Sequence, residues 1–150
     1  MKILLLGYSN LARKRLLPFF KKNKINVSVA SLSSEKKIKN ISKQYSSYDF
    51  ALKNSDADLV YISLPNALHF KWAFKALKLR YHVVVDKPLC DSVYELNKLI
   101  NLSYKNKKLL AEATFFNYHS QFNTLIKHIN NFDNIKKIKC NFTIPMPAHN

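Results

Sequence analysis

The chain has 150 residues, 47% of them hydrophobic, which is enough for the one buried core of a water-soluble α/β protein. No run of the sequence approaches the roughly 18 apolar residues of a membrane span. Its formal net charge of +16 comes from lysines scattered among asparagine and isoleucine. This pattern argues against specific nucleic-acid binding and leaves attraction to polyanions such as nucleotide cofactors. Cys90 and Cys140 lack metal-ligand spacing and a secretory context, so we expect no metal site and a reducing cytoplasm.

The start of the chain predicts a strand, a tight turn and a helix. The strand covers residues 3–6, too few for an export signal, and Gly7 closes it. Either Ser9 or Asn10 is suited to cap the helix, whose apolar residues recur at helical spacing: Leu11, Ala12, Leu16, Phe19 and Phe20. This is the phosphate-binding unit of a dinucleotide fold, although its glycine fingerprint reads G-x-S-x-x-A. We expect the cofactor to contact Gly7 and residues 9–11, with the Ser9 hydroxyl able to donate to a phosphate.

The second strand, Val27 to Leu32, indicates which dinucleotide is bound. In NAD-binding members of this fold, an acid near the end of this strand binds the ribose hydroxyls. Residues 30–37 read ASLSSEKK, so hydroxyls stand at the strand end and lysines follow. Because no acid repels a 2′-phosphate, we expect NADP(H) in preference to NAD(H), bound by Ser31, Ser33 and Lys36. Alternatively, Ser33 or Ser34 only caps a helix containing Ile38 and Ile41, and both roles are compatible.

The middle of the chain predicts a short strand or turn with a brief helix over residues 45–55, then a buried strand, Asp58 to Leu64. Pro65 and Asn66 stop that strand at its carboxyl end, where ligands bind in open α/β sheets. The next helix carries a buried stripe of Leu68, Trp72, Ala76 and Leu79. His69 lies inside this helix. It is either a neighbour of the cofactor, together with Leu64, Pro65 and Asn66, or a structural histidine.

Residues 81–90 read YHVVVDKPLC and are the central stretch of the chain. The valines after His82 suit a parallel strand that is buried on both faces. Asp86, Lys87 and Pro88 follow at its carboxyl end, which makes them candidates for a binding or catalytic site. The alternative is a salt-bridged turn in which Pro88 only ends the strand.

The remainder predicts one more helix, one more strand and then a different kind of sheet. Ser92 and Glu95 form a capping box for a helix with apolar residues at Val93, Leu96, Leu99 and Ile100, and a sixth strand covers residues 109–113. The amphipathic segment 114–129 begins with residues suited to face the cleft. Residues 135–144 alternate in polarity, which predicts a half-buried strand. We expect one domain over residues 1–116, then a connecting helix and a strand over 117–150.

Four segments in this order resemble the glucose-fructose oxidoreductase, inositol dehydrogenase and MocA family (Gfo/Idh/MocA), and the similarity covers essentially the whole chain. They are residues 7–12, the segment YISLPNALHFKWAFKAL, Asp86-Lys87-Pro88 in place of the family's Glu-Lys-Pro, and Glu112-Ala113 leading to Tyr118-His119-Ser120-Gln121. The first turn, His-Ser-Gln and residues 142–145 are most similar to reductases of nucleotide-linked keto-sugars. The resemblance implies a doubly wound, mostly parallel Rossmann sheet, followed by the first strand of a truncated α+β second domain.

The resemblance also implies hydride transfer between a nicotinamide and a carbonyl or hydroxyl of a sugar or nucleotide sugar. Lys87 would donate a proton to the substrate oxygen, while Tyr118, His119 and Gln121 would face the substrate. Asp86 is shorter than the family's glutamate by about 1.5 Å, which weakens its expected contact with the nicotinamide ribose. A cis peptide bond before Pro88 is implied as well.

The family continues into a second domain of comparable size that covers the nicotinamide and usually mediates oligomerisation. Only its first strand is expected here, so we interpret the chain as truncated or split. Such a chain binds NADP(H) weakly, does not turn over alone, and forms a homo-oligomer if the second domain is supplied. The alternative is a non-catalytic dinucleotide-binding fragment that acts with a partner subunit. The missing domain favours this alternative, and the intact Lys87 argues against it.

Overall fold

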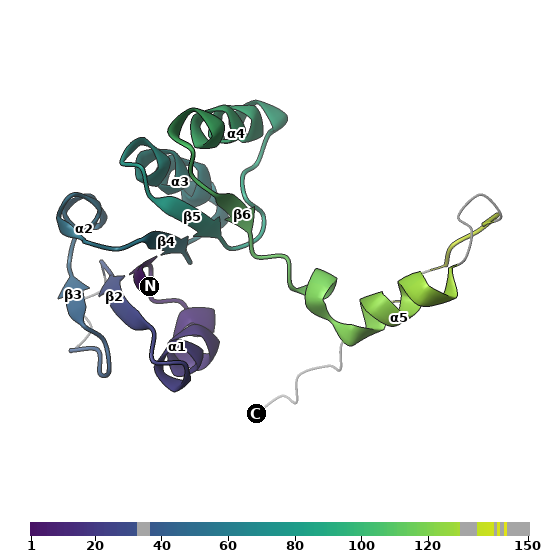
Figure 1. The fold of residues 1–150 in the computed structure, drawn as a ribbon, viewed down its shortest axis with the longest axis horizontal. Coiled ribbons are helices and arrows are strands. Elements are labelled where there is room, and N and C mark those ends of the chain that lie inside the picture. The colour runs from purple at the N-terminus through teal and green to yellow at the C-terminus, as the bar shows by residue number, and fades with distance from the viewer. Residues whose placement is uncertain (33–36, 130–134, 140, 142, 144–150) are drawn as a thin grey trace. The chain divides into compact units, whose positions relative to one another are not determined.

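The computed structural model describes residues 1–32, 37–129, 135–139, 141 and 143. The chain divides into two compact units, Met1–Thr114 and Phe115–Asn150. Within the described residues, the first unit holds every strand, and the second holds a short 3-10 helix and the last α-helix (Figure 1). The division follows directly after the last strand of the sheet.

A parallel sheet of six strands forms the centre of the first unit, in the spatial order β3-β2-β1-β4-β5-β6. Its strands are β1 (Lys2–Leu6), β2 (Asn26–Ala30), β3 (Lys43–Tyr45), β4 (Leu59–Ile62), β5 (His82–Val85) and β6 (Leu110–Glu112). The direction of winding reverses between β1 and β4, and open α/β sheets bind ligands at such a switch point. This order confirms the doubly wound Rossmann fold.

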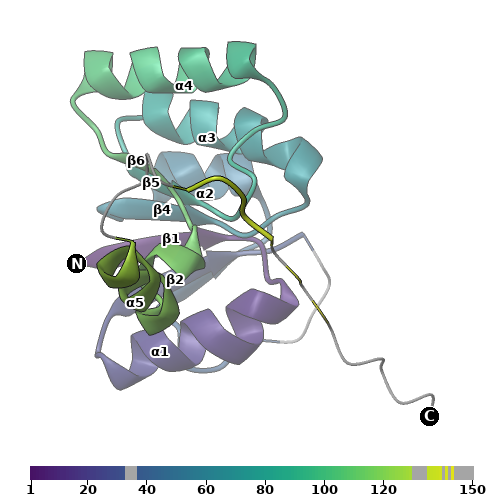
Figure 2. The same cartoon turned by 90° about the vertical axis from the view of Figure 1, so that its right-hand side faces the viewer.

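Helices cover both faces of this sheet (Figure 2). On one face lie α2 (Tyr48–Asn54), α3 (His69–Lys78) and α4 (Val93–Asn106), whose buried side chains pack on β1, β4 and β5. On the other face lies α1 (Leu17–Lys22), preceded by a π-helical turn over Ala12–Leu16, and Phe20 packs there on β1 and β2. The central strands are apolar because both of their faces are covered.

Three residues expected in buried stripes are exposed, namely Phe19 by 57%, Leu79 by 46% and Val93 by 72%. Phe19 turns outward because the π-helical turn winds more slowly than an α-helix, which brings Phe20 into line with the buried Ala12. Leu79 and Val93 stand at helix ends, as the C-cap of α3 and the first residue of α4. Periodicity alone places such end residues on the stripe, although the ends extend past the packed surface.

The segment between β2 and β3 departs from the prediction. Residues 37–42 form no helix, although Ile38 is buried and its amide donates to Gln44 Oε1 at 2.9 Å. The Ser42 amide donates to Val27 O at 2.8 Å, so the chain has already returned to the sheet where the helix was expected. Strand β2 ends at Ala30, and Leu32, its predicted last residue, is 65% exposed.

A serine side chain caps the start of α4, and a residue with a positive φ follows the end of α3. Ser92 Oγ accepts a hydrogen bond from the Glu95 amide at 3.2 Å, which confirms Ser92 as the cap. Glu95 Oε2 accepts from the Asp91 amide at 3.2 Å, one residue further back than a capping box requires. After α3, Arg80 adopts a φ of 64° in the position where helices usually carry glycine.

The second unit begins with a 3-10 helix, Phe115–Tyr118, followed by α5, Ser120–His128. Residues 135–139, 141 and 143 of the expected strand form no strand pairing, and Cys140, Phe142 and Ile144 lie outside the described residues. A β-strand is stabilised by a hydrogen-bonded neighbour, and the described part of this unit contains none. Within the described ranges, no helix combines the length and the apolar character needed to cross a membrane.

Candidate functional site

The carboxyl ends of β1, β2 and β4 meet around a cavity of about 460 Å³. Five predicted cofactor contacts line it: Gly7, Ser9, Ser31, Leu64 and Pro65. Four further lining residues were missed by sequence reasoning: Tyr8, Leu32, Tyr48 and Ser63. The structure therefore gathers part of the predicted set at the switch point of the sheet, where a dinucleotide is expected.

Gly7 permits the turn after β1 to approach the end of β4 closely. Its φ is +97°, and a Cβ at this position would lie 2.1 Å from Ser63 O and 2.8 Å from Leu64 Cδ2. Hydrogen bonds fix the backbone on both sides, since the Gly7 amide donates to Ala30 O at 2.9 Å and the Ser63 amide donates to Leu6 O at 2.8 Å. Both the backbone conformation and the available space require glycine here.

Ser9, and not Asn10, caps the helix that follows this turn. Ser9 Oγ accepts from the Ala12 amide at 3.1 Å, and the Ser9 carbonyl accepts from the Arg13 amide at 3.0 Å. The exposed Asn10 side chain instead accepts from the Arg13 guanidinium, and Leu11 is half-buried. The helix therefore begins at a residue that lines the cavity, which suits its first amides to binding a phosphate.

A chain of hydrogen bonds connects this turn with the end of β5. Ser63, which is 2% exposed, places its Oγ 2.7 Å from Ser9 Oγ and donates to Asp86 Oδ2 at 2.7 Å. Asp86 Oδ1 accepts from the Tyr61 hydroxyl, also at 2.7 Å. Both carboxylate oxygens of Asp86 are thus bound within the protein. We call Ser9, Ser63, Asp86 and Tyr61 the hydroxyl-carboxylate chain.

The Tyr61 hydroxyl keeps its proton and donates a hydrogen bond to Asp86 in the hydroxyl-carboxylate chain. Burial raises its pKa above the ordinary value of 10.0, and the hydrogen bond to Asp86 and the charge of Asp86 raise it further. Tyr61 and Ser63 are two residues apart around the end of β4, so their side chains share one face. The sequence signal for Ser63 was its place at the end of a buried strand, directly before Leu64, which is the argument that selected Asp86.

Lys87 is exposed beside Asp86, and its peptide bond to Pro88 is cis, as the resemblance implied. Among the described residues, ion pairs join Lys2 to Asp56 and Lys75 to Asp49. Lys87 belongs to neither pair, so the alternative of a salt-bridged turn is not formed in the part of the chain that the structure describes. Its ammonium group remains available at the sheet edge.

Glu112, at the end of β6, is held ionised by its neighbours. The Thr114 hydroxyl donates to Glu112 Oε1 at 2.7 Å and the Leu89 amide donates to Oε2 at 2.8 Å. These bonds, followed by the positive charge of Lys87, hold the pKa of Glu112 below its ordinary value. Glu112 thus remains ionised and attracts the Lys87 ammonium without forming an ion pair with it.

His69 is completely buried at the start of α3. Its Nδ1 lies 2.6 Å from Pro88 O and its Nε2 lies 2.8 Å from Leu64 O. Both ring nitrogens are therefore engaged by backbone carbonyls, and the ring joins the loop after β4 to the loop after β5. This position agrees with a structural histidine, because His69 supports the wall of the first cavity but does not line that cavity. Asn66 lies in the 3-10 helix Asn66–Leu68, between β4 and α3, and is exposed.

The β2 side of the site is strongly basic. A second cavity, of about 540 Å³, is lined by Arg13, Lys21, Lys37 and Lys39 together with neighbouring residues. Tyr8 lines both cavities, and the Arg13 guanidinium lies 5.8 Å from the centre of its ring. Ser31 is buried, whereas the predicted contacts Ser33 and Lys36 lie outside the described residues.

Tyr48 closes the first cavity on the α2 side. Burial raises the pKa of its hydroxyl, opposed by a backbone hydrogen bond from Leu32. Its ring packs edge-on against Trp72 at a centroid distance of 5.0 Å. Tyr48 therefore presents a fixed aromatic wall, a feature that the sequence did not single out because its role depends on the packing of α2 on α3.

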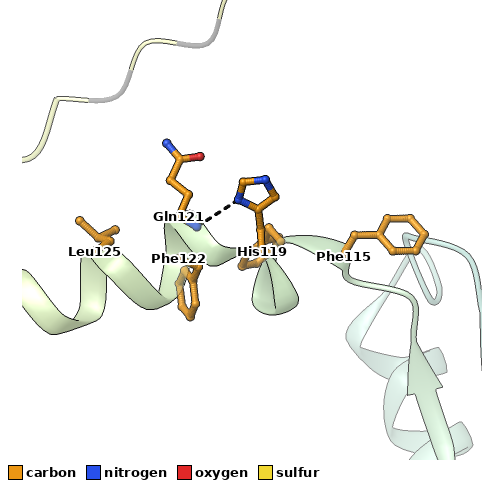
Figure 3. A pocket seen from close by; sticks show the side chains of 6 residues that line it. Phe115, His119, Gln121, Phe122 and Leu125 are labelled. Carbon is orange, nitrogen blue, oxygen red and sulfur yellow. Dashed lines mark hydrogen bonds between the residues drawn. The ribbon is translucent and has the colours of Figure 1, made fainter.

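The second unit contains its own cavity, of about 400 Å³, lined by Phe115, Phe116, His119, Gln121, Phe122 and Leu125 (Figure 3). His119 Nδ1 accepts from the Gln121 amide at 3.2 Å and so caps α5. Two of the predicted substrate contacts, His119 and Gln121, thus lie together, whereas Tyr118 is 89% exposed and does not line this cavity. Among the residues that the structure describes, no group of His, Cys, Asp or Glu side chains is arranged as metal ligands.

The sheet order, the glycine turn and the helix that starts beside it define a dinucleotide-binding Rossmann domain. Residues 1–114 match GFO_IDH_MocA, the oxidoreductase family with an NAD-binding Rossmann fold. The chain belongs to this family, which confirms the resemblance found in the sequence.

Relatives of the chain include enzymes of sugar metabolism. The dTDP-3,4-didehydro-2,6-dideoxy-alpha-D-glucose 3-reductase of Streptomyces violaceoruber is 31% identical over 148 residues, covering 93% of this chain and 43% of that protein. The D-xylose 1-dehydrogenase (NADP(+)) 2 of Haloferax volcanii is 35% identical over 75 residues, covering 50% of this chain and 23% of that protein. The chain thus spans less than half the length of either relative.

A solved structure similar to this chain is the 3-ketoreductase from Actinomadura kijaniata in complex with NADP and TDP-benzene. Its TM-score is 0.78 at 25% sequence identity, and the match covers 86% of this chain and 42% of that one. The similarity supports the same fold for the two proteins over the matched part.

Proposed function

We propose that the chain is the cofactor-binding half of an oxidoreductase that transfers a hydride between NADP(H) and a carbonyl or hydroxyl of a sugar or nucleotide sugar. The observation that carries this proposal is the cavity at the switch point of the sheet, whose wall is joined through Ser63 to Asp86, the residue before Lys87. The substrate class is supported by the relative named as a dTDP-sugar 3-reductase and by the 3-ketoreductase solved with TDP-benzene.

The residues of the cavity fit a dinucleotide. Gly7 lets the turn after β1 lie directly against Ser63 and Leu64, and the helix capped by Ser9 offers amides to a pyrophosphate. Tyr8 and Tyr48 provide aromatic surface within the same lining. When bound there, the cofactor supplies or accepts the hydride.

Lys87 is the proposed proton donor in the reducing direction. Its ammonium donates a proton to the carbonyl oxygen of the sugar as the carbon receives the hydride, and the neutral amine takes the proton back in the oxidising direction. Its exposure leaves it accessible to a substrate. Asp86, the residue before Lys87, is held in place by the hydrogen bonds that Tyr61 and Ser63 donate to it.

The proposed preference for NADP(H) rests on charge. A 2′-phosphate adds about two negative charges to the adenosine end, and the β2 side of the site carries Arg13, Lys37 and Lys39. The first acid after β2 in the sequence is Glu35, and the fold has no acid at the end of β2 itself to bind the ribose hydroxyls. Ser31, Ser33 and Lys36 remain proposed contacts of this phosphate.

We place the remaining roles in the second unit. Tyr118, His119 and Gln121 are the proposed substrate contacts, and the assembled enzyme is proposed to be a cytoplasmic homo-oligomer. A second candidate is a dinucleotide-binding subunit that acts with a partner chain. It is favoured by the 89% exposure of Tyr118 and by the use of His119 as a helix cap, since neither is organised as a substrate site within this unit.

Fluorescence titration of the chain with NADPH, NADH and single-stranded DNA tests the proposal. We expect NADPH to bind more tightly than NADH, most clearly at low ionic strength, and DNA to bind weakly without sequence preference. We expect no turnover of a dTDP-linked keto-sugar by residues 1–150 alone, and turnover when a second domain completes the site. Tight binding of DNA without any response to NADPH contradicts the proposal.

A further inference from the structure

The hydroxyl-carboxylate chain has a direction that follows from counting its protons. The Asp86 carboxylate is an acceptor only, and it accepts from Tyr61 at 2.7 Å and from Ser63 at 2.7 Å. Ser63 has a single hydroxyl proton, which is used on Asp86. In its 2.7 Å contact with Ser9, Ser63 must therefore accept, and Ser9 must donate.

The other contact of Ser9 agrees with this direction. Ser9 Oγ accepts from the Ala12 amide at 3.1 Å, which uses a lone pair and leaves its proton for Ser63. Ser63 is 2% exposed and Tyr61 is 7% exposed, so water does not readily replace either partner. In a buried site, an unpaired hydroxyl or carboxylate oxygen is costly, which keeps all three bonds formed together.

We propose that Asp86, acting through Ser63, directs the hydroxyl proton of Ser9 away from the cofactor, so that Ser9 is a positioning residue and not a phosphate donor. This inference rests on the proposed function for the identity of the ligand. Ser9 replaces the second glycine of the fingerprint, and its hydroxyl ties the phosphate-binding turn to the residue before Lys87. The amides that remain for the pyrophosphate are those of Asn10 and Leu11, because Ser9 Oγ and Ser9 O already accept from the next two.

The proposal also gives Asp86 a role that differs from a ribose contact. Both of its oxygens are engaged at 2.7 Å by residues of β4 and its end. Asp86 thus holds the Ser63 and Tyr61 hydroxyls in place by accepting a hydrogen bond from each. A carboxylate shorter than the family's glutamate suits this inward position.

The first experiment tests the bond between Ser9 and Ser63 without any ligand. Ser9→Ala, Ser63→Ala and the double variant are compared by urea unfolding. We expect the two single losses to be non-additive, with a coupling of about 2- to 10-fold in the unfolding equilibrium constant, because both remove the same hydrogen bond. Ser103→Ala, which removes a buried hydroxyl of α4 that donates to Ile100 O at 2.9 Å, should be additive with Ser9→Ala. Additive losses for Ser9 and Ser63 overturn the proposed bond.

The second experiment reverses the chain with Asp86→Asn. The new amide group can donate to Ser63 Oγ, which frees the Ser63 proton for Ser9 and the Ser9 proton for a phosphate. Donation to Tyr61 instead would strand the buried Tyr61 proton, so the amide should face Ser63. We therefore expect Ser9→Ala to weaken NADPH binding several-fold more in the Asp86→Asn background than in the native background.

These outcomes separate the proposal from the function on which it rests. If Ser9→Ala weakens NADPH binding equally in both backgrounds, Ser9 donates to the phosphate and the proposal is overturned. If the native chain does not bind NADPH, the proposed function fails, while the unfolding cycle still decides whether the bond between Ser9 and Ser63, on which the proposal depends, is formed.

Discussion

The two sides of the switch point differ in how they are prepared for a ligand. On the β4–β5 side, the polar groups are paired inside the protein: Ser63, Asp86 and His69 have hydrogen bonds of 2.6 to 2.8 Å. On the β2 side, a cavity is lined by Arg13, Lys21, Lys37 and Lys39. The first side fixes positions, and the second provides charge.

This difference predicts two kinds of response to substitution. Changes on the β4–β5 side should be large, specific to the position and insensitive to salt, because they alter packed geometry. Changes on the β2 side should be smaller and should fade as ionic strength rises, because exposed charges are screened over about 8 to 10 Å.

The largest effect is expected for Lys87→Ala in protein that turns over a keto-sugar. Loss of the proposed proton donor should lower kcat by about 10² to 10⁴, while the NADPH dissociation constant stays within about 2-fold. Lys98→Ala is the matched control, since Lys98 is exposed on α4 and packs on the Tyr94 ring at 4.2 Å. Full activity of Lys87→Ala contradicts the assignment of Lys87.

The next largest effect is expected for Gly7→Ala. The added Cβ would lie 2.1 Å from Ser63 O on a backbone with a φ of +97°, so the free energy of unfolding should fall by about 3 kcal/mol or more. Urea unfolding measures this loss, and NADPH binding should disappear with it. Lys107→Gly, at a φ of 53°, should be neutral or stabilising; an equally stable Gly7→Ala protein would contradict the tight approach of β1 to β4.

A smaller effect is expected on the β2 side. Replacing Lys37 and Lys39 together by alanine should weaken NADPH binding by about 3- to 10-fold at low salt, with less change for NADH and less at high salt. Replacing Lys98 and Lys105, two exposed lysines of α4, by alanine provides the control for the same change of net charge. An equal loss for both cofactors at all salt concentrations would mean that Lys37 and Lys39 do not act on the 2′-phosphate.

The smallest effect is expected for the pH dependence of stability at Glu112. Because its folded-state pKa lies below the ordinary value of 4.5, Glu112 stabilises the fold above pH 4.5, and this contribution is lost as pH falls through the folded-state pKa. Glu112→Gln should therefore lower Tm at neutral pH and should flatten the dependence of Tm on pH below 4.5. Unchanged curves would show that the Thr114 and Leu89 bonds do not distinguish the ionised from the neutral carboxyl.

The positions of the central strands and the turn at Gly7 were predictable because they depend on local signals. Continuous apolar runs marked β1, β4 and β5, and glycine, proline and capping residues marked their ends. Lys87 was identified by its place after a buried strand. The exposure of Phe19 was not predictable, because a π-helical turn changes the period on which an amphipathic pattern depends.

The parts of the site that were missed depend on contacts between distant segments. Ser63 meets Ser9 across 54 positions of the chain, and Tyr61 meets Asp86 across 25. His69 was considered a neighbour of the cofactor because it lies near the right edge, but the structure turns its ring between two carbonyls. A sequence indicates which residues stand at the sheet edge, and side-chain packing decides which of them face a ligand.

The most direct test of the proposed cofactor site is a map of the changes in backbone amide NMR chemical shifts when NADPH is added to the isotope-labelled chain. We expect changes at Gly7 to Leu11, at Ser31 and Leu32, and at Ser63 and Leu64, with no change around Ser103 in α4. Changes confined to α5, or the absence of any change at Gly7 to Leu11, would contradict a cofactor site at the carboxyl edge of the sheet.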